Sequence, residues 1–339
     1  MRANAGSRIG QSEGGRIMGN KLLLSRRQFN VRCAAYGLSL PAIGAGLALQ
    51  RGAHAAAVTT TGTPGRTVQF PDGTTVPALG QGAWHLGQQR HPAAVEQEAV
   101  RAGISLGMTL IDTSGDYGNG LSEKFIGKAI AGQRARIYLV SKVEADEVAG
   151  DGIARACEAS LSRLGTGYLD LYLLHSPVPS AQFAAVVAAF EKLRMAGKIR
   201  AWGVSKFDTA MMEELIRVPG GDRCATNQVQ YSLVNRHIER DLLPWCIQHN
   251  MPVMAYSPLG GDNHLVVEDP LLKKIAMAHG CSAAAVALAW VIRGGKVIAI
   301  PESGSPQHVR ENAQALTLEL TPLEIQTFSG RNGYSDPIA

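Results

Sequence analysis

The sequence predicts a single α/β domain folded as a (β/α)₈ TIM barrel, with a short N-terminal β-hairpin. Three observations predict this fold. Short apolar runs alternate with helical patterns along most of the chain, there are eight such runs, and several are apolar almost throughout. Strands that are covered by helices on one face and by a barrel interior on the other need apolar side chains on both faces. The length of 339 residues suits one large domain of this kind.

The first 55 residues have the features of an export leader. Eight of the 33 basic residues but only one of the 28 acidic residues lie there, so the remainder is nearly neutral although the whole chain carries +5. Ser25–Phe29, which contains paired arginines, precedes a weakly apolar run from Cys33 to Leu49 and then the small residues of Ala53–Ala55. This order is typical of a signal peptide, and the paired arginines resemble a twin-arginine export signal. We expect cleavage after Ala55 and a periplasmic protein that folds in the cytoplasm before export.

The alternative for this segment is an uncleaved membrane anchor. The apolar run has about 17 residues and contains Pro41 and three glycines, which is marginal for a stable span. We therefore expect no stable membrane insertion. Because the excess of positive charge lies in the leader, we also expect no nucleic-acid partner. The predicted organisation is a signal peptide at 1–55, a linker at 56–65, a barrel at 66–330 and a tail at 331–339.

The elements of the barrel follow in order. Two short extended pieces around a Pro-Asp-Gly turn predict a hairpin at Val68–Val76. The eight predicted strands are Ala78–Trp84, Thr109–Thr113, Ile137–Val143, Leu169–His175, Ile199–Lys206, Ala225–Tyr231, Pro252–Leu259 and Lys296–Ser303. Predicted helices between them include Pro92–Leu106, Glu147–Arg163, Ala181–Ala196, Arg240–His249 and a well-buried, alanine-rich one at Ser282–Arg293.

A doubly wound open sheet with a dinucleotide-binding turn is the alternative architecture. It requires a G-x-G-x-x-G turn after the first strand. The chain offers Gly80-Gln81-Gly82 without a third glycine in register, so the barrel is favoured. The mature chain has four widely spaced cysteines and no CxxC or Cys/His spacing, so we expect no metal site and mostly buried free thiols. These cysteines are Cys157, Cys224, Cys246 and Cys281.

Polar residues close several of the apolar runs, and in a barrel the carboxyl ends of the strands build the active site. Asp112, Lys142 and His175 end three successive runs, and Tyr117 follows Asp112 in a glycine-rich loop. Each residue alone has an ordinary structural interpretation, as a helix cap or a solvated side chain. Together, a carboxylate, a phenol, an ammonium and an imidazole at one mouth indicate a catalytic site.

This set suits carbonyl reduction, in which a hydride attacks carbon and oxygen receives a proton. Tyr117 can supply the proton, and a nearby Lys142 would lower the pKa of the phenol. Asp112 would hold Lys142 in place and charged. His175 could hydrogen-bond the carbonyl and orient it.

The motifs around these residues resemble those of the aldo-keto reductase superfamily over about residues 66 to 328. They are Ile111-Asp112-Thr113 with Tyr117-Gly118, Val140-Ser141-Lys142, Leu173-Leu174-His175, Gly203-Val204-Ser205 and Asn227-Gln228-Val229. Asp241–Cys246 and Pro252–Ser257 are similar to bacterial members described as methylglyoxal or aldehyde reductases. The resemblance implies NADP(H) or NAD(H) as cofactor and the four residues above as the catalytic tetrad.

The resemblance also implies the binding residues. Ser205, Asn227 and Gln228 would hold the nicotinamide carboxamide, Tyr256 with Ser257 would lie against the ring, and Trp84 would line the substrate pocket. Core filling is the alternative for Trp84 and Tyr256. The positions that the resemblance assigns to the adenosine end are Glu302, Ser303, Arg310, Glu311 and Asn312.

Two positions depart from the family pattern. Lys206 stands where the family has an asparagine that contacts the cofactor. Glu302 replaces a lysine, and His308 an arginine, that hold the 2′-phosphate of NADP in the family. Arg310, two residues further on, could still reach a phosphate. A carboxylate repels a phosphate but accepts hydrogen bonds from a free ribose hydroxyl. Glu302 therefore favours NAD.

We expect a monomeric reductase of small carbonyl compounds that also engages the twin-arginine export machinery. The short loops predicted at the barrel mouth suit small aldehydes, dicarbonyls or exposed sugars better than steroids. The alternative function is a non-catalytic, nicotinamide-binding subunit that senses redox state through a protein partner.

Overall fold

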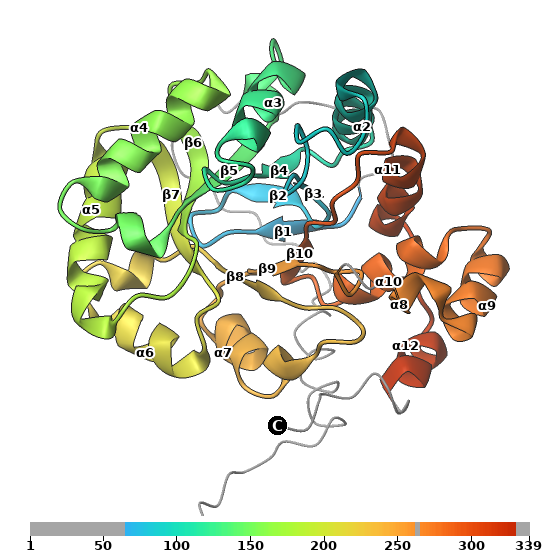
Figure 1. The fold of residues 1–339 in the computed structure, drawn as a ribbon. Helices are drawn as coiled ribbons and strands as arrows, with labels where there is room; N and C mark the ends of the chain where they lie inside the picture. Colours follow the sequence, from blue (N-terminus) through green and yellow to red (C-terminus); the bar gives the residue numbers. More distant parts are fainter. Residues whose placement is uncertain (1–64, 262–264, 330–339) are drawn as a thin grey trace, which may run out of the picture.

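The computed structural model describes residues 65–261 and 265–329. Eight parallel strands stand at its centre, in the same order in the sheet as in the chain, with helices around them (Figure 1). These strands are β3 (Gln81–Gly82), β4 (Leu110–Asp112), β5 (Tyr138–Val143), β6 (Leu169–Leu174), β7 (Ile199–Ser205), β8 (Asn227–Gln230), β9 (Val253–Tyr256) and β10 (Val297–Ala299). Each lies within the corresponding predicted range, so the strand assignment is confirmed.

The sheet closes into a barrel between its first and last strands. Leu79 pairs with Ala299 and Gly82 with Glu302, both in parallel register, and Gly80 N donates to Ala299 O at 2.8 Å. A Cβ atom on Gly82 would come within 2.8 Å of Ile300 O, so this close approach requires glycine. The predicted barrel is confirmed, and the open-sheet alternative is excluded.

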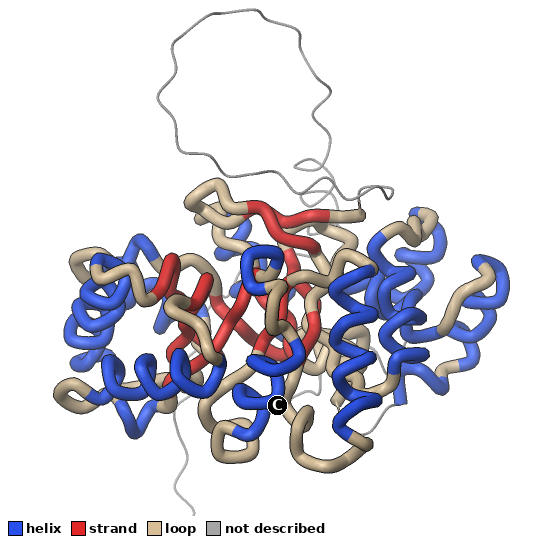
Figure 2. Tube along the Cα trace, turned by 90° about the horizontal axis from the view of Figure 1, so that it is seen from above, coloured by secondary structure: helices blue, strands red, loops and turns tan. Residues whose placement is uncertain are grey.

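Helices cover the outside of the strands, as Figure 2 shows from a second direction. They are α2 (Ala93–Ser105), α3 (Leu121–Ala129), α4 (Gly152–Leu164), α5 (Phe183–Met195), α6 (Thr209–Arg217), α7 (Leu242–Gln248), α8 (Leu265–Glu268), α9 (Pro270–His279), α10 (Ala283–Val291), α11 (Pro306–Ala313) and α12 (Pro322–Ser329). The alanine-rich α10 is buried from Ala285 to Val291, as predicted. The predicted start of the helix at Glu147 is wrong, because Gly150 adopts a φ of +57° in a turn before α4.

Short 3₁₀ helices connect several of these elements. They are η1 (Arg134–Arg136), η2 (Ala145–Glu147), η3 (Ser180–Gln182), η4 (Gly221–Arg223), η5 (His237–Glu239) and η6 (Gln314–Leu316). The element η2 follows β5 directly and therefore lies at the carboxyl end of the barrel.

The predicted hairpin is present as β1 (Thr67–Gln69) and β2 (Thr75–Pro77), paired in antiparallel register. The ring of Phe70 stacks on Tyr138, the first residue of β5, with ring centroids 5.3 Å apart. The hairpin therefore packs at the amino end of the strands and leaves the carboxyl end open.

The predicted leader at 1–55, the linker at 56–65 apart from residue 65, and the tail at 331–339 lie outside the described residues. The four cysteines of the described chain are free thiols, and all but Cys281 are buried. Across residues 65–261 and 265–329 no single helix is long and apolar enough to cross a membrane; only α9 and α10 together pass that test, bent by 95°.

Candidate active site

The carboxyl ends of the strands surround a cavity of about 510 Å³. Parallel register explains why distant polar residues meet there. Asp112 pairs with Val140, two residues before Lys142, and Lys142 pairs with Leu173, two residues before His175. The predicted site residues that line the cavity are Trp84, Asp112, Tyr117, His175, Ser205, Gln228, Tyr256, Ser257 and Glu302.

Lys142 lies beneath the cavity, and its side chain has no exposed area. Its ammonium donates to Asp112 Oδ2 at 2.7 Å, to Thr113 O at 2.9 Å and to the Tyr117 hydroxyl at 3.0 Å. An ammonium has three protons to donate, so all are used. Gln228 Nε2 donates to the other Asp112 oxygen at 2.8 Å, which leaves that carboxylate with a partner on each oxygen.

Tyr117 reaches Lys142 because of the loop that follows β4. Gly118, Asn119 and Gly120 adopt φ values of +58°, +54° and +80° in succession. Glycine and asparagine tolerate this left-handed region better than other residues. A Cβ atom on Gly118 would also lie 2.7 Å from the side chain of Gln88. The glycine-rich composition is therefore what lets the loop turn sharply and aim the phenol at the buried ammonium.

The electrostatics of the pair correct one prediction. Burial raises the pKa of Tyr117 above its ordinary value; Lys142 lowers it, but not enough to reverse the effect of burial. Burial also acts to lower the pKa of Lys142, but the charges and hydrogen bonds of Asp112 and Tyr117 outweigh it, and the net pKa shift is upward. The expectation that Lys142 lowers the pKa of the phenol holds for its own contribution, but the net shift is upward because the phenol is buried. At neutral pH Tyr117 is a protonated phenol beside a protonated amine.

His175 lies on the other side of the phenol, with the two rings edge to face and 5.7 Å between centroids. Its Nδ1 hydrogen-bonds the carboxylate of Glu144 and lies 3.4 Å from Ser114 Oγ. Glu144 was not among the predicted site residues. The signal for it was its position two residues after Lys142, at the end of the same strand.

The predicted carboxamide contacts separate into two groups. Ser205 and Gln228 line the cavity, whereas the amide of Asn227 donates to Phe207 O at 2.8 Å and accepts from Phe207 N at 3.4 Å. Asn227 is fully buried there, so its predicted contact with the cofactor does not fit its position. Lys206 lines the cavity with a φ of +62°.

The residues at the cavity floor fit a nicotinamide carboxamide. Ser205 Oγ donates its proton to Gln228 O at 2.9 Å, so its lone pairs are free to accept from an amide N–H group. Tyr256, half-buried, also lines the cavity and offers an aromatic face. Trp84 is 52% exposed, which excludes core filling for this side chain.

Glu302 holds the loop that carries Trp84. One carboxylate oxygen accepts from His85 N at 3.1 Å and the other lies 3.0 Å from His85 Nδ1. The ring of His85 in turn stacks on Trp84 with 4.3 Å between centroids. This contact was not predicted, because it joins positions 217 residues apart through a loop conformation.

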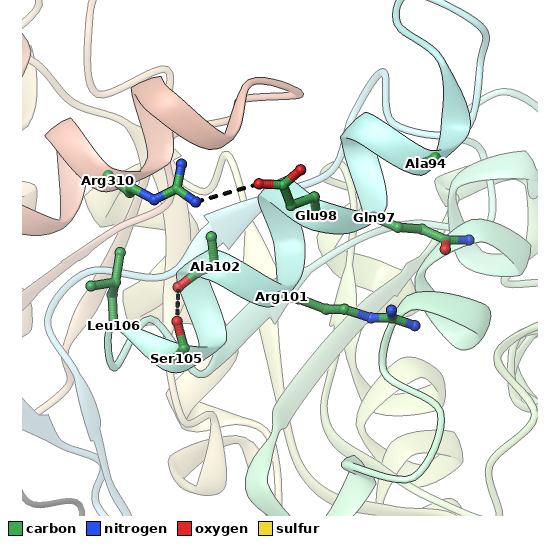
Figure 3. A pocket seen from close by; sticks show the side chains of 8 residues that line it. All are labelled: Ala94, Gln97, Glu98, Arg101, Ala102, Ser105, Leu106 and Arg310. Atoms are coloured by element: carbon green, nitrogen blue, oxygen red, sulfur yellow. Dashed lines mark hydrogen bonds and ion pairs between the residues drawn. The ribbon is translucent and has the colours of Figure 1, made fainter.

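Most of the predicted adenosine-end residues lie away from this cavity. Arg310, on α11, lines a surface pocket and pairs with Glu98 of α2 at 3.4 Å (Figure 3). Glu311 accepts from Gln307 at 2.9 Å, Ser303 Oγ accepts from Ser305 N at 3.1 Å, and Asn312 is buried. Within this predicted group, Glu302 lines the cavity.

Known proteins resemble this chain over most of its length. The profile described as "Aldo/keto reductase family" matches residues 78–330. The methylglyoxal reductase YeaE of Escherichia coli (strain K12) is 49% identical over 263 residues, which cover 77% of this chain and 92% of that protein. An aldo-keto reductase of Mycobacterium sp. (strain KMS) is 34% identical over 266 residues, covering 77% and 91% of the two chains.

Solved structures of aldo-keto reductases are also similar to this chain. A Klebsiella pneumoniae aldo/keto reductase in complex with NADP and acetate is 45% identical with a TM-score of 0.75, and the match covers 78% of this chain and 94% of that one. An aldo-keto reductase from the same organism in complex with NADPH is 44% identical with a TM-score of 0.74, at the same coverage.

The raised pKa of Tyr117 predicts that its hydroxyl ionises at a higher pH than a free phenol does. The difference between the wild-type and Tyr117→Phe absorbance titrations at the tyrosinate band should place the ionisation of this phenol above its ordinary pKa of about 10. Replacing Lys142 by Met should move the ionisation to still higher pH, because the neighbouring positive charge is lost. Ionisation of Tyr117 below pH 10 in the ligand-free protein would contradict the electrostatics described above.

Proposed function

The chain belongs to the aldo/keto reductase family, and from this membership we propose that it reduces small aldehydes and ketones to alcohols, with Tyr117 as general acid. It is an oxidoreductase that uses a nicotinamide cofactor. The observation that carries the proposal is the hydrogen-bonded chain from Asp112 through Lys142 to the Tyr117 hydroxyl, which ends at the cavity.

Tyr117, Lys142 and Asp112 have separate roles in the proposed proton transfer. A nicotinamide cofactor held by Ser205, Gln228 and Tyr256 would supply the hydride. Tyr117 holds its proton until negative charge develops on the substrate oxygen, and the positive Lys142 then stabilises the phenolate that proton transfer leaves behind. Asp112 keeps Lys142 charged and fixed between its acceptors. His175, at the edge of the phenol, orients the carbonyl group.

The size of the cavity supports a small substrate. About 510 Å³ must hold the nicotinamide ring as well as the carbonyl compound. The similarity to a protein named methylglyoxal reductase supports the same conclusion. We therefore propose small aldehydes and dicarbonyl compounds as the substrate class.

A non-catalytic, redox-sensing subunit is the alternative, and the Asp112–Lys142–Tyr117 chain disfavours it. A binding subunit has no need of a buried ammonium hydrogen-bonded to a phenol at the cavity. Purified protein that quenches the fluorescence of reduced cofactor but turns over no aldehyde or dicarbonyl compound would support the alternative.

Replacing Tyr117 by Phe removes the proposed proton donor and little else. We expect kcat to fall by at least about 10²-fold, with folding and cofactor affinity nearly unchanged. Lys142→Met should behave similarly, because the phenolate loses its stabilising charge. The matched control is Tyr138→Phe, which also removes a tyrosine hydroxyl, but at the amino end of the barrel. A Tyr117→Phe enzyme that reduces aldehydes at the wild-type rate would refute the role of Tyr117.

We further propose that this chain binds NADH at least as well as NADPH. The relatives solved with NADP and NADPH make the opposite preference the default. In this chain, however, Glu302 places a carboxylate on the cavity wall. Arg310, the nearest predicted substitute, is paired with Glu98 on the surface. Loss of one charge-assisted contact to the 2′-phosphate costs roughly 1.5–3 kcal/mol, about ten- to a hundred-fold in affinity.

Glu302→Lys should shift the preference toward NADPH through KM more than through kcat, because the ribose end is remote from the hydride. Glu302→Gln is the control, since it removes the charge but keeps an oxygen that can accept from His85 N. Fluorescence titrations with both cofactors give the affinities. Wild-type protein that binds NADPH at least tenfold more tightly than NADH would overturn this interpretation of Glu302.

We propose export by the twin-arginine route, supported by Ser25–Phe29 and Ala53–Ala55. Replacing Arg26 and Arg27 together by Lys should trap the precursor in the cytoplasm, because the export machinery recognises the paired arginines. Cell fractionation and N-terminal sequencing of the mature protein measure this. Arrival of the variant in the periplasm, or a mature N-terminus far from Ala56, would contradict the proposal.

A further inference from the structure

Strand register makes Glu144 a neighbour of the imidazole of His175. Val143 and Leu174, the last residues of β5 and β6, are partners in the parallel sheet, and His175 N donates to Val143 O at 2.9 Å. Glu144 follows Val143, and His175 follows Leu174. The contact between the Glu144 carboxylate and His175 Nδ1 therefore follows from the barrel itself.

Glu144 is held in place from its other side. It is the N-cap of η2, where its side chain accepts from the backbone N–H of Glu147 and the Glu147 side chain accepts from Glu144 N. This reciprocal arrangement is a capping box, which fixes both side chains at the start of a helix. The side chains of Glu144 and His175 are 28% and 12% exposed. The carboxylate is thus positioned in advance against a half-buried ring.

The charge of Glu144 decides which ring nitrogen carries the proton. Burial acts to raise its pKa, but the hydrogen bond and charge of His175, with Lys206 and Lys142, hold the net pKa below its ordinary value. An ionised carboxylate has no proton to donate, so Nδ1 must be the donor in this hydrogen bond. In a neutral ring Nε2 then carries a lone pair, which repels the lone pairs of a carbonyl oxygen.

We propose that Glu144 is a positioning residue that keeps a proton on His175 Nδ1, so that Nε2 donates a hydrogen bond to a carbonyl oxygen only from the imidazolium form. This inference rests on the proposed function for the identity of the acceptor. The proton stays on Nε2, because Tyr117 provides the proton that the alcohol gains. A cationic donor stabilises developing negative charge on oxygen more than a neutral one does, and the Glu144 carboxylate offsets the cost of that cation beside Lys142.

The other titratable groups around the cavity leave a clear pH window for this test. Tyr117 and Lys142 have pKa values raised above their ordinary ranges, so both remain protonated well into the alkaline region. An imidazole titrates nearer neutrality than a phenol or an ammonium group. The remaining charged or titratable residues lining the cavity are His85, Arg90, Asp112, Asp116, Lys206, Tyr256 and Glu302, and burial raises the pKa of Tyr256. Of these, His85 is the other imidazole, and it is paired with Glu302.

The kinetic test compares Glu144→Gln with the wild type at saturating cofactor. Wild-type kcat/KM should fall tenfold per pH unit once the imidazolium is lost. A glutamine amide can donate to Nδ1 and leave a proton on Nε2 of the neutral ring. The variant should therefore have about tenfold lower kcat/KM at neutral pH, the difference between a charged and a neutral donor, but keep its activity further into the alkaline range. Asp146→Asn, which removes one exposed charge from the same short helix, should leave the pH profile unchanged.

A spectroscopic test needs no turnover. In the free protein labelled with ¹⁵N-histidine, the His175 signals are those missing from a His175→Gln variant. At alkaline pH the wild-type ring should be protonated on Nδ1, and the Glu144→Gln ring on Nε2. Because this readout is independent of activity, failure of the proposed reductase function and failure of the Glu144 proposal are distinguishable.

Three results would overturn the proposal. One is a neutral wild-type ring protonated on Nε2. Another is an alkaline limit that Glu144→Gln does not move. The third is a Glu144→Gln effect that persists undiminished in a His175→Gln background, because a positioning residue acts through the ring that it positions.

Discussion

A buried ammonium group holds this site together. The Lys142 side chain is removed from solvent, and burial of an unpaired charge costs several kcal/mol even after the protein relaxes. The cost is offset because Asp112, Thr113 O and the Tyr117 hydroxyl accept its three protons. All three acceptors come from β4 and the loop after it. The register of β4 on β5 and the left-handed turn at Gly118–Gly120 are therefore parts of one constraint. A shift in either would leave a proton of the ammonium without an acceptor.

The same principle operates one strand further round the barrel. Glu144 stands beside His175 as Asp112 stands beside Lys142, in each case with acid and base on adjacent parallel strands. In the reduction that we propose, each group that interacts with the substrate oxygen would thus be supported by a carboxylate behind it. This pairing would let two potential cations lie close to one oxygen without a large excess of positive charge. It would also separate two tasks, since the phenol would give up a proton and the imidazole would keep its own.

The sequence was sufficient to predict the strands, the barrel and the convergence of Asp112, Tyr117, Lys142 and His175. Apolar runs of strand length and polar residues at their ends are local features, and the parallel topology then determines which ends meet. The direction of the Tyr117 pKa shift was not predictable, because it depends on how completely the phenol is buried. The contacts of Asn227 with Phe207 were not predictable either, since an amide next to a predicted cofactor-binding residue can equally well bind the backbone of a neighbouring loop. The contacts of Glu302 with His85 require a loop conformation that no local pattern encodes.

The Glu302–His85 contact links two properties that are usually considered separately. The carboxylate follows the last strand, at the position that we propose to influence cofactor preference, yet its two oxygens contact the backbone and the ring of His85. That ring stacks on Trp84, which is half-exposed at the cavity mouth. If Glu302 acts on the cofactor as we propose, a side chain that binds phosphate at this position would lose the contacts that hold the loop with Trp84. Cofactor preference and pocket shape would then be coupled through one residue.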